Sequence, residues 1–321
     1  MVRFPTKRKK SEVIRPTSEA ALQPLTGNRE VSLRPAPDWM RRNYFLQVYF
    51  PSMFTPRSGE VQTPEWKALS PGEVEVTWIG HASFLVSTHA TRFLIDPVWA
   101  KWIKGLKRIS HPGVPVSHLG PIDLVLVTHA HFDHLDRRTL RKVAAGQPVI
   151  VPAGVSDLVT DLGFGPVFES THWVTFEVAS CRITLVPCRH WGARLIHDRR
   201  RSFGGYVIET PSATIYHGGD TAYFEGFKEI GERFDIDLAI LPIGAYDSPS
   251  GRDVHMNPEQ ALEAFGQLRA KHMIPMHYGA YRLSYEPVTE PPERLLSAAV
   301  EQGVSEHVHI LREGFPFVFQ F

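Results

Sequence analysis

A short histidine-rich segment carries the most distinctive chemistry in this sequence. Thr128-His129-Ala130-His131-Phe132-Asp133-His134 places three imidazoles and one carboxylate close together, directly after the apolar run Leu124 to Val127. A continuous apolar run bounded by turn residues indicates a buried strand. Open α/β sheets place their sites in the loops that leave the C-terminal ends of strands. The segment therefore predicts a metal site at the edge of a sheet.

The same arrangement recurs at three other places. His190 follows a predicted strand at 182–186, Asp220 follows one at 213–216, and His277 follows one at 273–275. Imidazole and carboxylate ligands without a thiolate suit zinc, iron, manganese or cobalt. Seven ligands are too many for one tetrahedral ion but suit two ions with one bridging carboxylate. The predicted metal ligands are His129, His131, Asp133, His134, His190, Asp220 and His277.

Short apolar strands alternate with helical patterns from residue 73 onward, which is typical of an α/β fold. Asn257, Pro258 and Gln260 form an N-cap, a first-turn proline and a capping-box partner, and Pro291 and Gly303 bracket another helix. The predicted strands are 73–79, 92–95, 123–127, 149–152, 182–186, 206–209, 213–216, 238–241 and 273–275.

The N-terminal part differs in composition from the rest. Residues 1 to about 35 are polar and basic, and they cannot bury enough apolar surface to offset the entropy of ordering. Residues 39–54 are rich in aromatic side chains beside Arg41 and Arg42 and could lie on a membrane interface, although packing onto the main domain is the favoured interpretation. We expect an N-terminal extension at 1–60 and one main domain at 61–321.

Charge and hydropathy exclude several classes of protein. Lys and Arg total 35 against 34 Asp and Glu, so there is no global field to attract nucleic acid. No run approaches the roughly 20 apolar residues of a membrane-spanning helix, and the basic N-terminus has no apolar segment typical of a secretory signal. We expect a cytoplasmic protein with peripheral membrane contact as an open alternative.

Taken as a set, the motifs resemble the metallo-β-lactamase fold, and in particular the N-acyl-phosphatidylethanolamine-hydrolysing phospholipase D family and its bacterial relatives. The motifs that carry the resemblance are Thr77 to Ala82, Asp96-Pro97, the His129 segment through Asp136, His190-Trp191, Gly219-Asp220-Thr221, Pro242 to Tyr246, His255 to Glu259 and His277-Tyr278-Gly279. The resemblance covers residues 73 to 312.

The resemblance implies a four-layer αββα sandwich and a dinuclear metal centre. It implies that His129, His131 and His190 hold one ion, that Asp133, His134 and His277 hold the other, and that Asp220 bridges them. It also implies a phosphodiesterase of phospholipase D type that acts on N-acyl-phosphatidylethanolamine-like lipids through a metal-bridging hydroxide. Zinc is the favoured metal, with manganese or iron as alternatives, and a homodimer is plausible for the family.

The remaining candidate residues have roles that the sequence leaves open. His81 is expected to contact a ligand or face substrate, and Asp96 either orients a metal-bound imidazole or forms an Asp-Pro turn. His255, His81 and Tyr278 are candidates for stabilising developing charge. The predicted catalytic residues are Asp133, Asp220, His255 and His81.

Spacing decides between some members of the superfamily. Only 29 residues separate His190 from Asp220, so the inserted domain of the nucleases does not fit there. Classical β-lactamases carry a cysteine where Asp220 stands, which argues against antibiotic hydrolysis. A lactonase or ester hydrolase acting on a small, sugar-phosphate-like substrate remains an alternative, as does a non-catalytic metal-binding protein. The polar loop between Tyr246 and His255 departs from the family pattern at positions that are expected to select the substrate.

Overall fold

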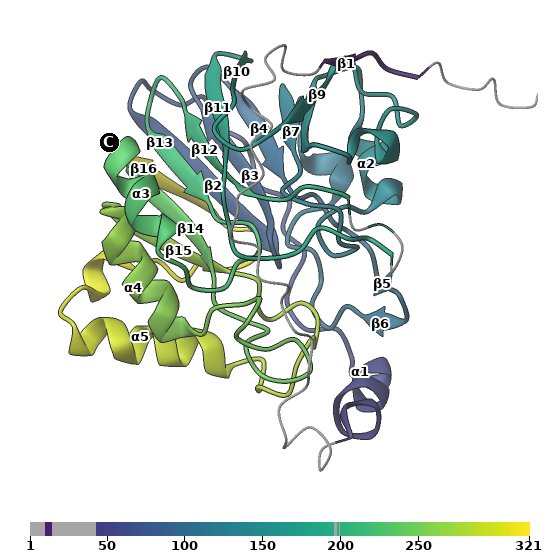
Figure 1. Ribbon diagram of the computed structural model, residues 1–321, viewed down its shortest axis with the longest axis vertical. Helices are drawn as coiled ribbons and strands as arrows, with labels where there is room; N and C mark the ends of the chain where they lie inside the picture. Colours follow the sequence, from purple (N-terminus) through teal and green to yellow (C-terminus); the bar gives the residue numbers. More distant parts are fainter. Residues whose placement is uncertain (1–9, 15–42, 196–197, 199) are drawn as a thin grey trace, which may run out of the picture.

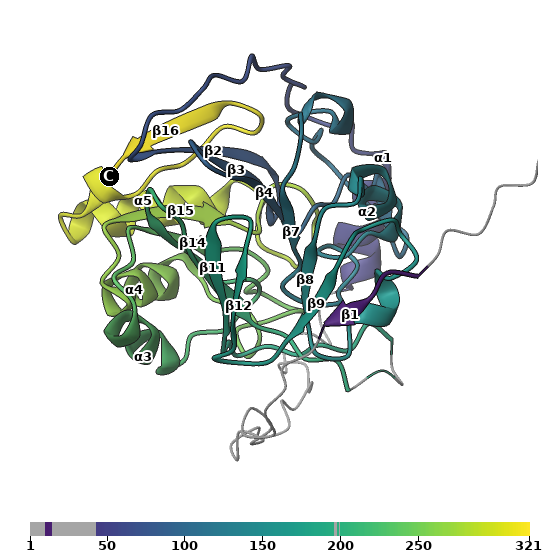
Figure 2. The same cartoon turned by 90° about the horizontal axis from the view of Figure 1, so that it is seen from above.

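The structure is a computed structural model that describes residues 10–14, 43–195, 198 and 200–321. Two β-sheets pack face to face, with helices on both outer faces (Figures 1 and 2). This is the αββα arrangement expected from the sequence. The basic N-terminal cluster (apart from Lys10) and Trp39, Arg41 and Arg42 fall outside the described residues. No helix among those described is long and apolar enough to cross a membrane.

The first sheet has eight strands and contains most of the segments that lead to the histidine cluster. Its central strands β2, β4 and β7 run in the same direction, because β3 is antiparallel to both β2 and β4 and β7 is parallel to β4. In spatial order the strands are β1 (Val13–Ile14), β9 (Val167–Ser170), β8 (Val149–Pro152), β7 (Leu124–Leu126), β4 (Arg92–Ile95), β3 (Ser83–Thr88), β2 (Glu73–Gly80) and β16 (Pro316–Gln320).

The second sheet has six strands, and β11, β13, β14 and β15 run in one direction. In spatial order they are β10 (Thr175–Val178), β11 (Cys181–Val186), β12 (Gly205–Glu209), β13 (Thr214–His217), β14 (Leu238–Pro242) and β15 (His272–Met276). All nine strands expected from the sequence are present, each within one residue at either end. Strands β3, β9, β10 and β16 and the short strands β1, β5 and β6 were not among those predicted.

The helices are short, and most of them cover the sheets. Residues Asn257 and Gln260 form the expected capping box at the start of α4, with Gln260 N 2.9 Å from Asn257 Oδ1. The α-helices are α1 (Phe50–Phe54), α2 (Arg137–Val143), α3 (Gly226–Arg233), α4 (Pro258–Leu268) and α5 (Glu290–Glu301). A π-helical turn, η3 (Phe45–Tyr49), leads into α1, and 3-10 turns occur at η4 (Val116–His118), η5 (Ser156–Leu158) and η6 (Ser305–His307).

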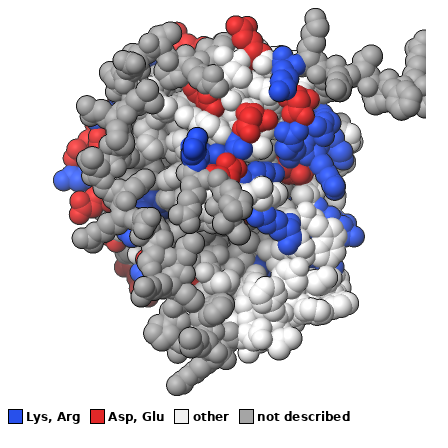
Figure 3. Space-filling model, turned by 45° about the vertical axis from the view of Figure 1, so that its right-hand side comes forward, with Lys and Arg blue, Asp and Glu red and all other residues white. Residues whose placement is uncertain are grey.

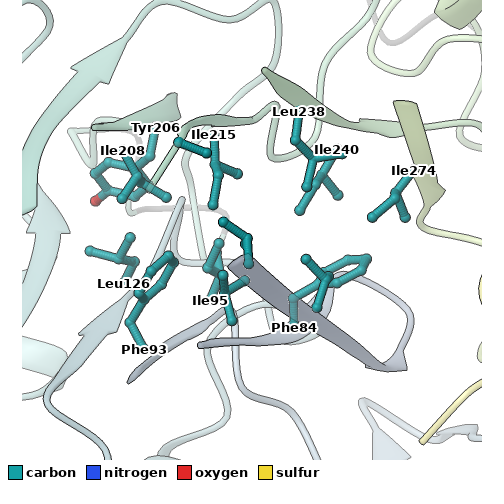
Figure 4. Packing of buried hydrophobic residues seen from close by; sticks show 14 of the residues in the cluster. Phe84, Phe93, Ile95, Leu126, Tyr206, Ile208, Ile215, Leu238, Ile240 and Ile274 are labelled. Carbon is teal, nitrogen blue, oxygen red and sulfur yellow. The ribbon is translucent and has the colours of Figure 1, made fainter. Parts of the chain in front are cut away.

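The main core lies between the two sheets. Figure 4 shows Phe84, Phe93, Ile95 and Leu126 of the eight-stranded sheet facing Ile208, Ile215, Ile240 and Ile274 of the six-stranded sheet. Helices α3, α4 and α5 cover the outer face of the six-stranded sheet, and α2 packs on the other sheet. Buried apolar area on both faces of each sheet holds the strand ends in fixed positions.

Candidate metal centre

The predicted ligands lie at one common edge of the two sheets. His81, Asp96 and the His129 segment follow β2, β4 and β7, whereas His190, Asp220 and His277 follow β11, β13 and β15. Because the strands within each of these sets run the same way, their C-terminal ends meet at that edge. The backbones of His81, Asp96 and His277 adopt left-handed conformations, with φ of 58°, 43° and 63°. Such backbone strain is concentrated at functional sites.

All seven predicted ligands, together with His81, form two adjoining groups. We call His129, His131, His190 and Asp220 the His129 group, and His81, Asp133, His134 and His277 the His134 group. In each group one ligand atom from every member lies within 4.8 Å of the others. Asp220 joins the groups, since its Oδ2 lies 3.1 Å from Nε2 of both His134 and His277. The same oxygen lies 3.8 Å from Nε2 of His129 and of His190.

Hydrogen bonds behind the rings of His134 and His129 orient both rings. Asp96 Oδ2 accepts from His134 Nδ1 at 2.7 Å and from the Thr128 hydroxyl at 2.6 Å. The hydroxyl donates to Asp96, so it accepts from His129 Nδ1 at 3.0 Å. Nε2 of His129 is therefore left with a lone pair, and both this atom and Nε2 of His134 face Asp220. This supports the first of the two roles left open for Asp96.

His190 is oriented by a backbone carbonyl. Its Nδ1 lies 3.0 Å from the oxygen of Val254, an acceptor only, so Nδ1 donates and Nε2 keeps its lone pair. Nδ1 of His131 lies 3.2 Å from Nε2 of His190 and 2.9 Å from Nε2 of His129. Val254 thus contributes to the site through its main chain.

The donor set fits divalent cations. Nε2 of His131 and Oδ1 of Asp220 are buried and have no hydrogen-bond partner, and Nε2 atoms of four histidines lie within 3.8 Å of Asp220 Oδ2. An arrangement of buried acceptors without donors is costly unless a cation neutralises it. Nitrogen and carboxylate ligands oriented by hydrogen bonds behind them are typical of zinc and related ions.

Burial lowers the pKa of three ring ligands, whereas Asp220 outweighs burial at two others and raises the pKa of His134 and of His277, the latter to about 9. Burial lowers the pKa of His131 to about 3 and that of His190 to about 4, and it also lowers that of His129. These rings are neutral at pH 7, the state that binds metal. Burial alone would raise the pKa of Asp220, but His134 and His277 hold it well below its ordinary value. The Asp220 carboxylate is therefore ionised at pH 7.

His81 and Asp133 form a pair inside the His134 group. His81 Nε2 lies 3.0 Å from Asp133 Oδ2, and its ring lies 4.1 Å from that of His277. His81 is almost fully buried and is not among the residues that line the cavity described below. It is thus placed to orient Asp133 and not to contact substrate. Burial lowers the pKa of His81 to about 3, so the ring is neutral.

A cavity of about 510 Å³ opens onto the ligands. His131, Asp133, His190, Asp220 and His255 form part of its lining. His255 also lies within ligand distance of Asp220 and His277, and its buried Nδ1 has no hydrogen-bond partner. Tyr278 was a candidate for charge stabilisation, but this expectation is wrong for the structure: its ring packs 4.9 Å from that of Trp78 and does not line the cavity.

Several cavity residues were not identified from the sequence as parts of the site. Arg194 and Lys104 both lie over the Phe132 ring, with distances to its centroid of 4.0 Å and 4.3 Å. Arg194 follows His190-Trp191 by a few residues, which was the only signal available. Tyr44, Phe45 and Tyr49 form an aromatic wall. Within the aromatic segment, Tyr44 and Tyr49 therefore face the domain while Phe50 and Phe54 are exposed.

Comparisons with known proteins agree with this geometry. A family described as "Beta-lactamase superfamily domain" matches residues 91–278. An uncharacterised protein of Mycobacterium tuberculosis is 33% identical over 72% of this chain, which spans 65% of that relative's length. N-acyl-phosphatidylethanolamine-hydrolyzing phospholipase D 1 of Caenorhabditis elegans is 32% identical over 68% of this chain and 68% of its own length.

Solved structures show the same fold. Igni18, a metallo hydrolase from the archaeon Ignicoccus hospitalis, superposes with a TM-score of 0.60 at 25% identity, over 78% of this chain and 99% of that one. The family match covers more than half of the chain and includes all seven predicted metal ligands. The chain belongs to the β-lactamase superfamily and has the metallo-β-lactamase fold.

Proposed function

We propose that this protein is a dinuclear phosphodiesterase that cleaves an amphipathic, anionic phosphodiester of the N-acyl-phosphatidylethanolamine type. The single observation that carries the proposal is the composition of the cavity. Metal ligands form its floor, aromatic and aliphatic side chains form one wall, and Lys104 and Arg194 stand beside Phe132. A substrate that matches this lining has an anionic reacting group joined to an apolar part.

Zinc in both positions is our proposal for the metal, because nitrogen and carboxylate ligands predominate, and manganese or iron would fit the same donors. Two divalent ions bound there would lower the pKa of a water toward neutrality and neutralise charge on the phosphodiester oxygens. Asp220 lies between the two ligand groups and holds them together. Asp96 and the Val254 carbonyl keep His134 and His190 in the tautomers that present Nε2.

The residues around the ligands would bind and orient the substrate. His255 lines the cavity, and burial lowers its pKa well below the ordinary value, so its neutral ring can donate one hydrogen bond to an oxygen that gains charge. Lys104 and Arg194 would attract the anionic group. The aromatic wall of Tyr44, Phe45 and Tyr49 would receive apolar atoms and exclude water.

Cavity size limits how much of a lipid can enter. A volume of about 510 Å³ is within the range that encloses one drug-sized group, roughly 300–1,000 Å³. A phospholipid with several long acyl chains exceeds it. The phosphodiester and part of one chain would therefore occupy the cavity while the other chains stay outside. The name of the nematode relative, which hydrolyses N-acyl-phosphatidylethanolamine, supports the same substrate class.

The experiment is a hydrolysis panel on protein loaded with zinc or manganese. We expect cleavage of bis-p-nitrophenyl phosphate and release of a phosphatidic-acid-type product from N-acyl-phosphatidylethanolamine in detergent. Activity confined to lactones or carboxylic esters would assign the alternative reaction and reject the phosphodiesterase. Inertness toward all of these substrates, with both ions bound, would favour a non-catalytic metal-binding protein. The Asp220→Asn variant provides the control for metal-dependent turnover.

A further inference from the structure

We infer that the helical run Phe45–Phe54 and the β5–β6 hairpin (Trp102–Ile103 and Leu106–Lys107) form a docking surface for an anionic lipid bilayer at the mouth of the cavity. We call it the docking surface. The inference names the partner of the proposed lipid hydrolase and rests on that function for its biological meaning. The observations that support it come from a separate part of the molecule.

The helical run has an inner and an outer face. Val48 and Ser52 are buried, and the Tyr44 hydroxyl at its start donates to the Arg282 carbonyl. The outer face carries Leu46, Phe50 and Phe54, which are 67%, 53% and 77% exposed. These three residues recur at every fourth position, so they share one side of the helix. Large apolar side chains held outward on an anchored helix are typical of interfacial binding.

The hairpin lies directly against this run. Lys107 Nζ donates to the carbonyls of Met53 and Thr55, at 3.2 Å and 2.6 Å, and so ties the end of α1 to β6. The exposed Trp102 ring extends the apolar surface onto β5. Figure 1 places α1 beside β5 and β6, on the side of the molecule away from α4 and α5. The two segments therefore act as one surface.

Charge on the two segments selects the partner. Residues 43–59 and 97–122 contain Arg57, Lys101, Lys104, Lys107 and Arg108 and no Asp or Glu. Arg108 is buried, but the other cations are at least partly exposed. In a chain with balanced charge overall, this is a local positive region around an apolar helix. In Figure 3 a band of Lys and Arg lies above the uncharged lower part of the surface.

An anionic bilayer satisfies both features at once. Its headgroups complement the lysines, and its acyl region receives the outward apolar side chains. A second copy of this chain would bring like charges together, which disfavours a symmetric dimer through the same surface. The surface also adjoins the cavity, because Phe45, Tyr49, Ile103, Lys104 and Leu106 line it. A lipid could thus pass from the bilayer into the cavity while its other chains remain in the membrane.

The test measures co-sedimentation of the full chain with vesicles. One vesicle is phosphatidylcholine alone, and the other mixes phosphatidylcholine with phosphatidylglycerol in equal parts; neither is the proposed substrate. We expect binding to the mixed vesicles that weakens as salt is raised. The variant Leu46→Ser/Phe50→Ser/Phe54→Ser should lower the partition coefficient at least roughly tenfold. Lys101→Gln should lower it about fivefold on mixed vesicles and leave weak binding to phosphatidylcholine unchanged.

The matched control removes exposed apolar side chains elsewhere. Leu296→Ser/Val300→Ser on α5 changes residues that are 40% and 66% exposed and should bind vesicles like the parent. Equal binding by the parent and the triple variant would overturn the inference, as would a change in oligomeric state without any change in vesicle binding. Hydrolysis of soluble bis-p-nitrophenyl phosphate separates the two proposals. Turnover without vesicle binding rejects the docking surface alone, and vesicle binding without turnover rejects the phosphodiesterase alone.

Discussion

Asp96 lies 2.7 Å from Nδ1 of His134, and through the Thr128 hydroxyl the same carboxylate oxygen also orients His129. One buried side chain therefore sets the tautomer of a ligand in each of the two groups. Hydrogen bonds of this kind orient metal-bound imidazoles and raise their basicity. Neither ring would be held with Nε2 toward Asp220 without it.

Replacing Asp96 with asparagine should weaken metal binding without removing a ligand. The amide can present an N–H toward His134 Nδ1, which would favour the wrong tautomer. We expect affinity for zinc to fall about 10–100-fold, with a parallel loss of activity. Competition with a chromogenic chelator measures the affinity. Thr128→Val should weaken metal binding only in the His129 group. Asp157→Asn, which removes the carboxylate of the surface pair with Arg201, is the control and should leave metal affinity unchanged. Unchanged affinity in Asp96→Asn would contradict the orienting role of Asp96.

Asp220→Asn should abolish turnover and loosen one ion. Asp220 is the only residue whose oxygen lies within 3.8 Å of Nε2 atoms from both groups among the described residues. Its amide replacement carries no charge and donates where an acceptor is needed. Metal analysis after dialysis should give fewer ions per chain than for the parent. A variant with full metal content and near-normal activity would show that Asp220 does not bridge.

The strand ends were predictable from sequence because each ligand follows a short apolar run. The same local pattern indicates both the strand and the ligand after it. The roles of Asp96 and His81 were not predictable, since both depend on contacts between strands that are distant in sequence. An Asp-Pro turn and a buried aspartate that orients a histidine have the same sequence signature. Strands β3 and β16 lacked a ligand or a clear boundary to mark them. The cavity wall was missed for the same reason: Tyr44 and Lys104 meet the metal centre only through tertiary packing.

His255→Ala should lower kcat while metal content stays full. His255 lines the cavity and lies near both Asp220 and His277, so its loss removes a hydrogen-bond donor near the reacting group. We expect kcat to fall at least about a hundredfold with little change in KM. Metal analysis of the same sample distinguishes two roles. Loss of an ion would make His255 a ligand, which is a different assignment from the one made above.

Metal removal should destabilise the fold. Without a cation, the carboxylates of Asp133 and Asp220 lie close together among the histidines and Oδ1 of Asp220 is buried without a partner, and a cation relieves this. At a free metal concentration about 100 times the Kd, binding adds about 2.7 kcal/mol to the free energy of unfolding. Thermal unfolding with chelator and with added zinc measures the shift. Asp220→Asn should gain less from zinc than the parent does, and equal gains would contradict binding through Asp220.

Lys104→Gln should raise KM for an anionic substrate and leave kcat nearly unchanged. Lys104 lies over the Phe132 ring, Nζ to centroid 4.3 Å, and donates to the Arg194 carbonyl, so no carboxylate among the described residues competes with a substrate anion. An exposed charge pair contributes up to about 1 kcal/mol, which corresponds to a rise in KM of up to about fivefold. Initial rates with bis-p-nitrophenyl phosphate provide the measurement. Lys101→Gln is the matched control, because Lys101 does not line the cavity. A fall in kcat at constant KM would place Lys104 in the chemical step and reject a role in attracting the substrate.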